Sequence, residues 1–291
     1  MTNITVLQMG DLTHDQVRND FYANTIPNHL KTNHAHVEKP HKHNFYVCMI
    51  FTKGSGKHEI DFNTYDVVPG SVFMVAPGQT HSWVLSEDID GYIFFHTQEF
   101  FDLYYVRESI REYPVFRSVF SPNGFYISGQ EREEIEHLFK KMVQEVEGDL
   151  WKKNQVLLNI VSLFYIETNR ILLTDQSFKV QYSSSYYNHF QAFEGLLEKF
   201  FMIEKSAAVY ANKLNMTQKH LNRICKTLVN QTTTDIILDR VILEAKRMLM
   251  YTGKSFNEIA LDLGYEDYSY FSKVFKKRAD CTPKEFQKRY E

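Results

Sequence analysis

Three histidines in the first third of the chain are spaced as in a metal site or a ligand pocket. His41 and His43 are two residues apart in a stretch rich in aromatic and branched side chains, and His81 follows a Pro-Gly pair. In a strand, residues i and i+2 share one face, so the first two imidazoles point the same way. Such a set could hold a metal ion or line a pocket for a polar ligand.

A second group of candidate residues lies near the C-terminus, in residues 217–228. Leu221, Ile224 and Cys225 recur at helical spacing and are expected to face inward, which leaves a polar outer face without an acid. This face comprises Lys219, His220, Asn222, Arg223 and Lys226. Arginine can pair with guanine and asparagine with adenine, whereas Lys226 suits phosphate. The pattern predicts a helix that enters the major groove of DNA, and the alternative is a solvated polar face.

A similar polar face follows in residues 268–277. Tyr270, Phe271, Val274 and Phe275 are expected to face inward. The outward set is Tyr268, Ser269, Ser272, Lys273, Lys276 and Lys277. Within this set Ser269, Ser272 and Lys273 give weak base readout, so this helix is expected to contribute phosphate contacts and groove fit.

Each of these helices is preceded by a short partner helix, as in a helix-turn-helix. Residues 207–214 precede the first, and Thr217 can cap the helix that follows. Residues 255–263 precede the second, with a capping box at Ser255 and Glu258 and a left-handed end at Gly264. Between the two helix-turn-helix units, residues 234–251 are expected to form a helix that Thr234 or Asp235 can cap. Its apolar residues Ile237, Val241, Ala245 and Leu249 share one face, the seam of this helix. Its length of ~27 Å approaches the ~34 Å of one DNA turn.

The C-terminal motif resembles a known family signature. Residues 264–277 read GYEDYSYFSKVFKK, followed by Thr282-Pro283 and Arg289-Tyr290, which closely resembles the AraC/XylS family of bacterial transcription regulators. The resemblance implies a transcription regulator that binds double-stranded promoter DNA, forms homodimers and acts with RNA polymerase; it could be an activator or a repressor, since the sequence does not distinguish the two. By register, Lys219, Asn222 and Arg223 fall on positions that meet base edges in that family.

The first half of the chain alternates short apolar stretches with glycine turns. Residues 41–52 are apolar on both faces and predict one central strand, and residues 57–62, 71–76 and 91–96 predict further strands. Residues 1–40 are expected to form an irregular arm that could include an edge strand. Helical patterns over 129–148 and 151–173 suit either packing on the sheet or a dimer contact. The spacing indicates an all-β sandwich or barrel with flanking helices.

Two short motifs in this half resemble those of cupins. Pro77-Gly78-Gln79-Thr80-His81 is similar to the second cupin motif, and His41-x-His43 to the start of the first. Cupin enzymes add a glutamate to bind iron or manganese, but Val47 or Cys48 occupies that position here. We therefore expect a ligand pocket lined by His41, His43, His81, Trp83 and His96, with His58 structural. No cofactor is expected, and purified protein should carry well under one equivalent of iron, manganese or zinc; a three-histidine metal site is the alternative.

Composition agrees with a two-part chain. Its 291 residues carry a net charge of −3, yet residues 186–291 hold 17 Lys and Arg against 13 Asp and Glu. Three dispersed cysteines predict reduced thiols, and the N-terminus lacks a signal peptide pattern. No run of eighteen apolar residues predicts a membrane span. A cytoplasmic location is therefore expected.

Together these patterns predict a two-domain α+β protein. We expect a cupin-like barrel with flanking helices over residues 1–173, a linker over 174–185, and an all-helical domain with two helix-turn-helix units over 186–291. The hypothesis is a regulator, not an enzyme, whose barrel binds a small molecule such as a sugar or related polar metabolite. Two alternatives are an effector-free regulator whose pocket is closed by its own aromatic residues, and a metal-dependent cupin enzyme.

Overall fold

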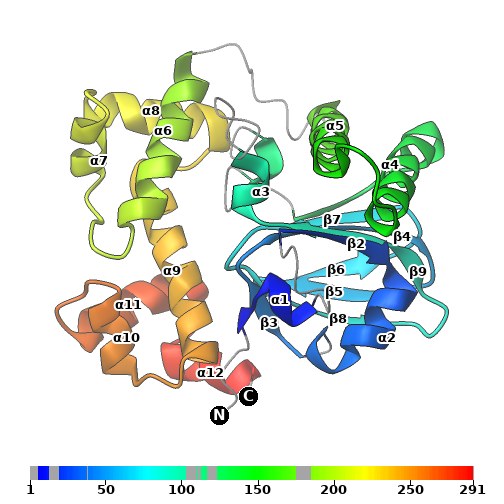
Figure 1. The fold of residues 1–291 in the computed structure, drawn as a ribbon. Helices are drawn as coiled ribbons and strands as arrows, with labels where there is room; N and C mark the ends of the chain where they lie inside the picture. Colours follow the sequence, from blue (N-terminus) through cyan, green and yellow to red (C-terminus); the bar gives the residue numbers. More distant parts are fainter. Residues whose placement is uncertain are drawn as a thin grey trace. The chain divides into compact units, whose positions relative to one another are not determined.

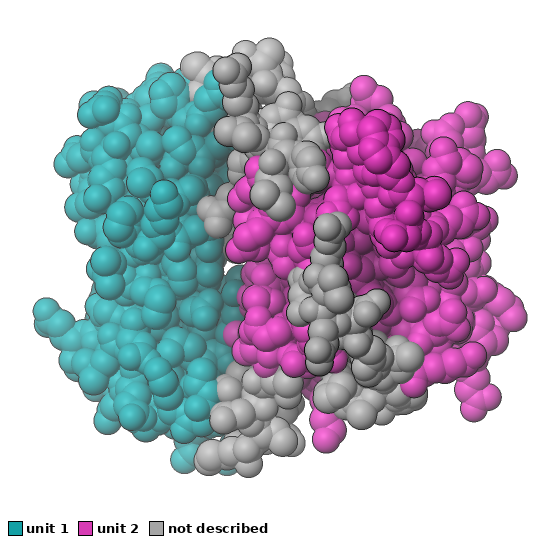
Figure 2. Space-filling view, viewed as in Figure 1, with its two compact units in different colours: residues 1–3, 180–291 teal, residues 4–179 magenta. Residues whose placement is uncertain are grey.

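The computed structural model describes residues 6–12, 20–37, 39–102, 110, 113–116, 123–174 and 185–290. It divides into two compact units, one of residues 4–179 and one that contains residues 180–291 (Figure 2). The first unit is built on β-sheets and the second is helical, so the prediction of a two-domain α+β fold is confirmed. The expected linker falls mostly on residues 175–184, which lie outside the described residues.

The first unit contains two five-stranded sheets (Figure 1). One has the order β1 (Val6–Leu7), β3 (His41–His43), β8 (Thr80–Leu85), β5 (Gly56–Ile60) and β6 (Asn63–Val67). The other has the order β10 (Gly124–Tyr126), β7 (Ser71–Val75), β4 (Tyr46–Lys53), β9 (Asp90–His96) and β2 (Phe21–Thr25). All pairs of strands are antiparallel except β1 with β3.

The expected single strand over residues 41–52 is wrong, because the chain changes sheets within it. β3 belongs to the first sheet and β4 to the second, with a bend at Asn44 and Phe45 between them. Phe45 remains fully buried, so the inward direction of His41 and His43 continues through the bend. β4 is the middle strand of its sheet and is buried on both faces, which confirms that this stretch is central.

Two apolar layers hold this unit together. Val47, Met49 and Phe95 belong to the core between the two sheets. Cys48 and Phe94, from the opposite faces of the same strands, pack on α3 (Gln98–Asp102), α4 (Gly129–Glu147) and α5 (Lys153–Thr174). By length and composition alone α5 could cross a membrane, but half of its apolar window is buried. Its burial against the second sheet accounts for that apolar character.

The N-terminal arm is more regular than expected. Besides β1 and β2 it contains α1 (Met9–Leu12) and α2 (Ile26–Val37), so the description as irregular is wrong. Ile26 and His29 on α2 are both buried, and the His29 ring contacts Phe95 at 5.3 Å. The sequence of α2 is polar and has no clear helical pattern, so the helix was not predicted. Its stability comes from packing on the sheet, which the local sequence does not reveal. A short 3-10 helix, Pro114–Phe116, completes the described elements of this unit.

The second unit is a set of seven helices within residues 185–290. They are α6 (Ser185–Phe200), α7 (Ala207–Lys213), α8 (Gln218–Val229), α9 (Thr233–Tyr251), α10 (Phe256–Asp262), α11 (Tyr268–Ala279) and α12 (Pro283–Tyr290). Thr217 caps α8 and the Ser255–Glu258 capping box starts α10, as predicted. The cap of α9 was placed wrongly: Thr232 is the cap, in a box with Asp235.

α9 connects the two helix-turn-helix units (Figure 1). Its predicted seam of Ile237, Val241, Ala245 and Leu249 is buried. With 19 residues it has a length of about 28 Å. α6, α7 and α8 gather at its start and α10 and α12 at its end, and the last turn of α11 bonds Asp235 and Asp239 in its first half. One helix therefore contacts both helix-turn-helix units.

Gly264 offers a test of how α10 is joined to the rest of this unit. Its φ is +71°, and a Cβ there would lie 2.4 Å from the Met202 carbonyl oxygen. Gly264→Ala is expected to lower the free energy of unfolding by about 2–3 kcal/mol, from left-handed strain plus the clash. Gly253→Ala is the control, because φ is +65° but nothing lies within 4 Å. Urea denaturation that shows equal losses for the two variants would contradict the proposed close approach.

Candidate nucleic-acid interface and histidine cluster

α8 exposes a basic face, as the sequence predicts. Lys219, Arg223 and Lys226 are exposed and His220 is half-buried. The Arg223 guanidinium donates a hydrogen bond to His220 Nδ1 at 2.7 Å and lies 5.7 Å from the Tyr186 ring. A hollow of about 480 Å³ at the start of the helix is lined by Met216, Thr217, Lys219, His220 and Arg223. The face thus offers both charge and a concave surface.

Asn222 has a further role that the sequence did not reveal. It is half-buried, and its Oδ1 accepts a hydrogen bond from the Thr233 backbone N–H at 3.1 Å. Thr233 is the first residue of α9, so this bond attaches α8 to the connecting helix. A bidentate pair with adenine uses both the oxygen and the nitrogen of the amide. Base contact by Asn222 would therefore compete with this internal bond.

α11 exposes the second basic face. Ser269, Lys273, Lys276 and Lys277 are exposed, and Ser272 is half-buried. Tyr268 is half-buried because its ring stacks on that of Phe256, with centroids 5.8 Å apart.

Tyr270 was expected to face inward, and this is wrong. It is 60% exposed. The buried stripe of α11 runs through Phe271 and Phe275, and one residue back along a helix is a turn of ~100° away from it. The exposed face of α11 therefore contains an aromatic ring beside its lysines.

Ion pairs attach α11 and α6 to α9. Arg278 near the end of α11 donates to Asp235 and, at 3.1 Å, to Asp239, both on α9. The hydrogen bond from Thr232 and the one from Arg278 lower the pKa of Asp235. Arg240 on α9 is 7% exposed and bonds Glu198 of α6 at 2.8 Å. The Glu198 side chain is 35% exposed, so its removal would leave the buried Arg240 guanidinium without this carboxylate and weaken the attachment of α6 to α9.

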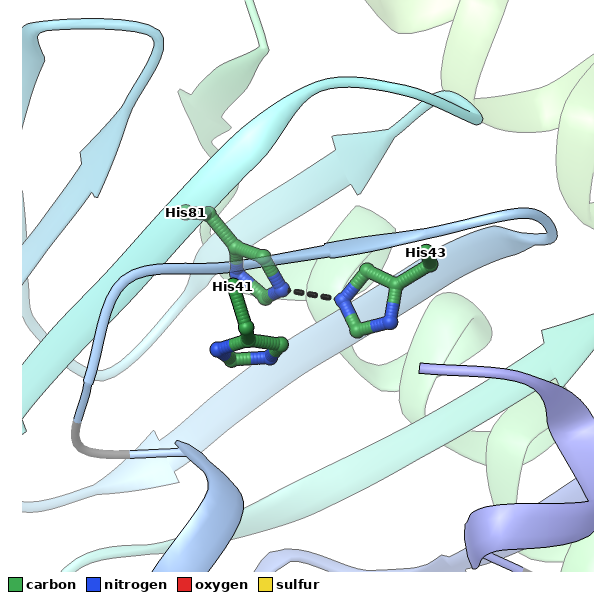
Figure 3. Close-up of side chains that lie close together, drawn as sticks. All are labelled: His41, His43 and His81. Atoms are coloured by element: carbon green, nitrogen blue, oxygen red, sulfur yellow. Dashed lines mark hydrogen bonds between the residues drawn. The ribbon is translucent and has the colours of Figure 1, made fainter. Parts of the chain in front are cut away.

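The three histidines singled out in the sequence come together inside the first unit (Figure 3). His41 on β3 is paired directly with His81 on β8, and His43 lies two residues along on the same face. One ring nitrogen from each lies within 4.8 Å of the others, and all three residues are buried. His43 Nε2 and His81 Nε2 face each other in a hydrogen bond. Two predicted site residues on β3 and one on β8 thus form one cluster.

Hydrogen bonds at the outer edge of the cluster orient its rings. His41 Nδ1 donates to the Lys39 carbonyl oxygen at 2.8 Å, and His58 Nε2 lies 2.8 Å from His81 Nδ1. His58 was expected to be structural only, although alternation along residues 57–62 turns it inward with Ile60. Burial lowers the pKa of His58 to about 3 and lowers the pKa values of His43 and His81 well below the usual range. The cluster therefore contains neutral imidazoles.

Trp83 and His96, also predicted to line the pocket, have different positions. Trp83 is buried, and its ring lies 5.5 Å from that of His81. His96 was placed wrongly: it faces the helices, where its Nε2 is 2.6 Å from the Tyr165 hydroxyl of α5. Strand alternation explains this, because the preceding Phe95 faces the other sheet. Tyr165 had no distinguishing signal in the sequence.

The position of a cupin carboxylate is apolar in this chain. Val47 is fully buried between the sheets, and Cys48 faces α5, with its Sγ 3.6 Å from the Tyr165 hydroxyl. Within the described residues, His41, His43 and His81 form the only metal-type group of three or more, and no carboxylate belongs to it. A four-ligand iron or manganese site with one carboxylate therefore does not fit these residues.

Aromatic side chains occupy much of the space between the sheets. Phe45, Phe51, Phe73, Trp83 and Phe95 are all at most 4% exposed. They share one core with the apolar residues of β4, β7 and β9. Such aromatic packing is what the alternative of an effector-free regulator, with its pocket closed by its own side chains, predicts.

The fold and the two basic helices define a class: a two-domain DNA-binding regulator. Residues 210–289 match the model described as "Helix-turn-helix domain", and residues 29–155 match the model described as "AraC-like ligand binding domain". The chain belongs to the AraC family of transcription regulators. It is thus a DNA-binding transcription regulator with a ligand-binding domain.

Three similar proteins illustrate the relationship. The "HTH-type transcriptional activator RhaR" of Mannheimia succiniciproducens is 21% identical over 253 residues, covering 86% of this chain and 87% of the relative. The "Regulatory protein SoxS" of Escherichia coli K12 is 36% identical over 81 residues, covering 28% of this chain and 76% of the relative. A crystal structure of fatty-acid-bound ToxT from Vibrio cholerae, 13% identical, covers 94% of this chain and 96% of that chain with a TM-score of 0.42.

Buried neutral histidines predict acid sensitivity of the first unit. Burial lowers the pKa of His29 and of His96 to about 4. The unfolded chain, with a histidine pKa of ~6.5, takes up protons first, so stability is full above pH ~6.5 and falls toward pH ~4. Each of these two histidines should cost roughly 1.4 kcal/mol at pH ~5.5 relative to pH ~7.5.

Chelator-treated protein and urea denaturation followed by tryptophan fluorescence measure this loss. Both tryptophans, Trp83 and Trp151, lie in this unit, so the signal reports on it alone. His96→Gln should reduce the loss by roughly 1.4 kcal/mol, which is the share of this one histidine, while the other buried histidines of the unit keep theirs. A stability that does not change between the two pH values would show that these histidines are not buried in neutral form.

Proposed function

We propose that the chain is an activator whose first unit binds a small molecule and thereby controls DNA binding by the second. The observation that carries the DNA half is that α8 and α11 both expose basic faces and are both bonded to α9. A shared rod of about 28 Å suits two successive major grooves on one face of the duplex. The effector would shift the population toward the arrangement that binds DNA.

Within the interface we assign different tasks to the exposed residues. Arg223 and Lys219 on α8 are proposed to read base edges, with Asn222 added if its bond to Thr233 opens. His220 and Lys226 complete the α8 surface. On α11, the proposed phosphate and groove contacts are Tyr268, Ser269, Ser272, Lys273, Lys276 and Lys277. This division follows from the fork of arginine, which suits guanine, and from the point charge of lysine, which suits phosphate.

The effector proposed for the first unit is a sugar or related polar metabolite. The buried Trp83 indole offers a stacking surface, and its Nε1 has no hydrogen-bond partner in the described structure. His41, His43 and His81 supply polar atoms beside it. The aromatic filling of the interior favours the alternative of a regulator without an effector. A screen of sugars by thermal shift distinguishes the two, because a ligand of the folded state raises the midpoint.

Assembly and location complete the proposal. We propose a cytoplasmic homodimer that contacts RNA polymerase at promoters. α5 exposes Leu163 at 44% and Ile166 at 38%, and the segment just before this helix exposes Leu150 at 67% and Trp151 at 85%. Apolar side chains that gather on the outer face of a helix are typical of an interaction surface. A second copy of α5 would cover them.

The DNA contacts are tested by Arg223→Ala and Lys276→Ala. Loss of a bidentate base contact at Arg223 should cost roughly 1–3 kcal/mol and relax preference at a single base pair. Loss of a phosphate contact at Lys276 should weaken binding to all sequences alike and reduce the salt slope by about one. Titrations use an operator found by selection and scrambled DNA at several salt concentrations.

The matched control for these titrations is Lys140→Ala, which removes an exposed lysine on α4 in the other unit. It should leave DNA affinity unchanged. Equal weakening of both DNAs by Arg223→Ala would make Arg223 a phosphate contact. If neither interface variant matters, these faces do not meet DNA.

The dimer is tested on the full chain by Leu163→Lys combined with Ile166→Lys. Wild-type protein should sediment as a dimer at tens of micromolar, and the double variant as a folded monomer, because two charges cannot be buried unpaired. Lys140→Ala again serves as the control. A wild-type monomer at this concentration would contradict the dimer, and a dimeric double variant would place its interface elsewhere.

A further inference from the structure

The histidine cluster has the form of a small closed triangle. The ring centroids of His41, His43 and His81 are 4.8, 4.5 and 4.7 Å apart, and the three residues are 1%, 3% and 2% exposed. We infer that this triangle binds one divalent first-row transition ion, zinc being the best fit, and leaves one coordination position for an anion. The inference deepens the effector half of the proposed function, and it does not depend on DNA binding.

The distances between the ring nitrogens fit this inference. Zinc–nitrogen bonds of ~2.0–2.1 Å in a tetrahedral site place the nitrogens ~3.3 Å apart. One nitrogen from each ring already lies within 4.8 Å of the others, so small ring rotations suffice. His43 Nε2 and His81 Nε2 face each other directly. Both cannot carry a hydrogen there, whereas both can direct lone pairs at one ion.

The hydrogen bonds at the outer edge of the triangle support the same geometry independently. The Nδ1–H of His41 donates to the Lys39 carbonyl, which leaves the lone pair of this ring on Nε2. His81 Nδ1 lies against His58 Nε2, and donation from His81 leaves its lone pair on Nε2 as well. Metal-binding histidines nearly always donate their second ring nitrogen in this way. His58 is therefore a positioning residue for His81.

The chemistry of the ligand set selects the ion. Imidazole nitrogens suit zinc, copper and nickel, whereas manganese prefers oxygen ligands that this group lacks. The sequence-based expectation of little bound zinc depended on the missing carboxylate. That absence excludes a cupin-type four-ligand set, but three histidines with an open position are a known zinc geometry. Three neutral ligands leave two positive charges in an apolar core, so an anion such as a carboxylate or hydroxide is favoured in the fourth position.

Metal binding by the full chain tests this directly. The protein is stripped with a chelator, dialysed against zinc chloride and analysed for bound metal; cobalt(II) is used in parallel, because a four-coordinate cobalt site absorbs strongly in the visible range. The expected result is about one equivalent of zinc and a four-coordinate cobalt spectrum. His43→Ala and His81→Ala should each lose both signals. His58→Gln should weaken binding by about 10–100-fold.

Two histidine variants serve as controls. His137→Ala removes an exposed histidine on α4, and His96→Gln changes a buried histidine that faces the helices. Both should bind zinc like the wild type. Far-ultraviolet circular dichroism checks folding, and His43→Gln replaces His43→Ala if the alanine variant unfolds. Less than about one tenth of an equivalent in the wild type, or binding that survives both ligand variants, would overturn the inference.

Discussion

The burial of α9 is the constraint on which the DNA-binding unit depends. Its seam of Ile237, Val241, Ala245 and Leu249 is withdrawn from water among the other helices of this unit. Arg240 and Arg278 then attach α6 and α11 to it through carboxylates, and Asn222 attaches α8 through a backbone N–H. Because each recognition helix is bonded to the same rod, their separation is set by helix geometry rather than by a flexible loop.

A comparable constraint organises the first unit. β4 is buried on both faces, so one strand belongs to two cores at once. One face of β4 packs in the core between the sheets, on the side of the histidine cluster. The other face contains Cys48, which contacts the Tyr165 hydroxyl of α5, and the same hydroxyl is hydrogen-bonded to His96. A change in the interior therefore has a short physical path through β4 to the helices that cover the second sheet. This path gives the proposed effector control a mechanical basis within the unit.

Several local patterns predicted local features correctly. The capping box of Ser255 and Glu258 and the left-handed Gly264 depend on neighbours within a few residues, and both are as expected. Two local assignments failed, the cap of α9 and the inward direction of Tyr270. The other failures involve distant partners. The bend at Asn44 depends on strands that pair far along the chain, and α2 depends on packing against Phe95.

The candidate sites show the same division. Alternation placed His41 and His43 on one face, but their meeting with His81 needed the β3–β8 pairing. His96 was placed on the wrong side because its strand's orientation was unknown. Asn222 accepts its hydrogen bond from the Thr233 N–H, which belongs to another helix, so the local sequence pattern could not predict this bond.

We propose that one molecule places two helices, both bonded to α9, in successive major grooves. Hydroxyl-radical footprinting of the full chain on a short selected operator that binds a single molecule measures this most directly. Two protected stretches on one face of the duplex, about 10 base pairs apart, are expected. A single protected stretch, or two stretches on opposite faces, would contradict it.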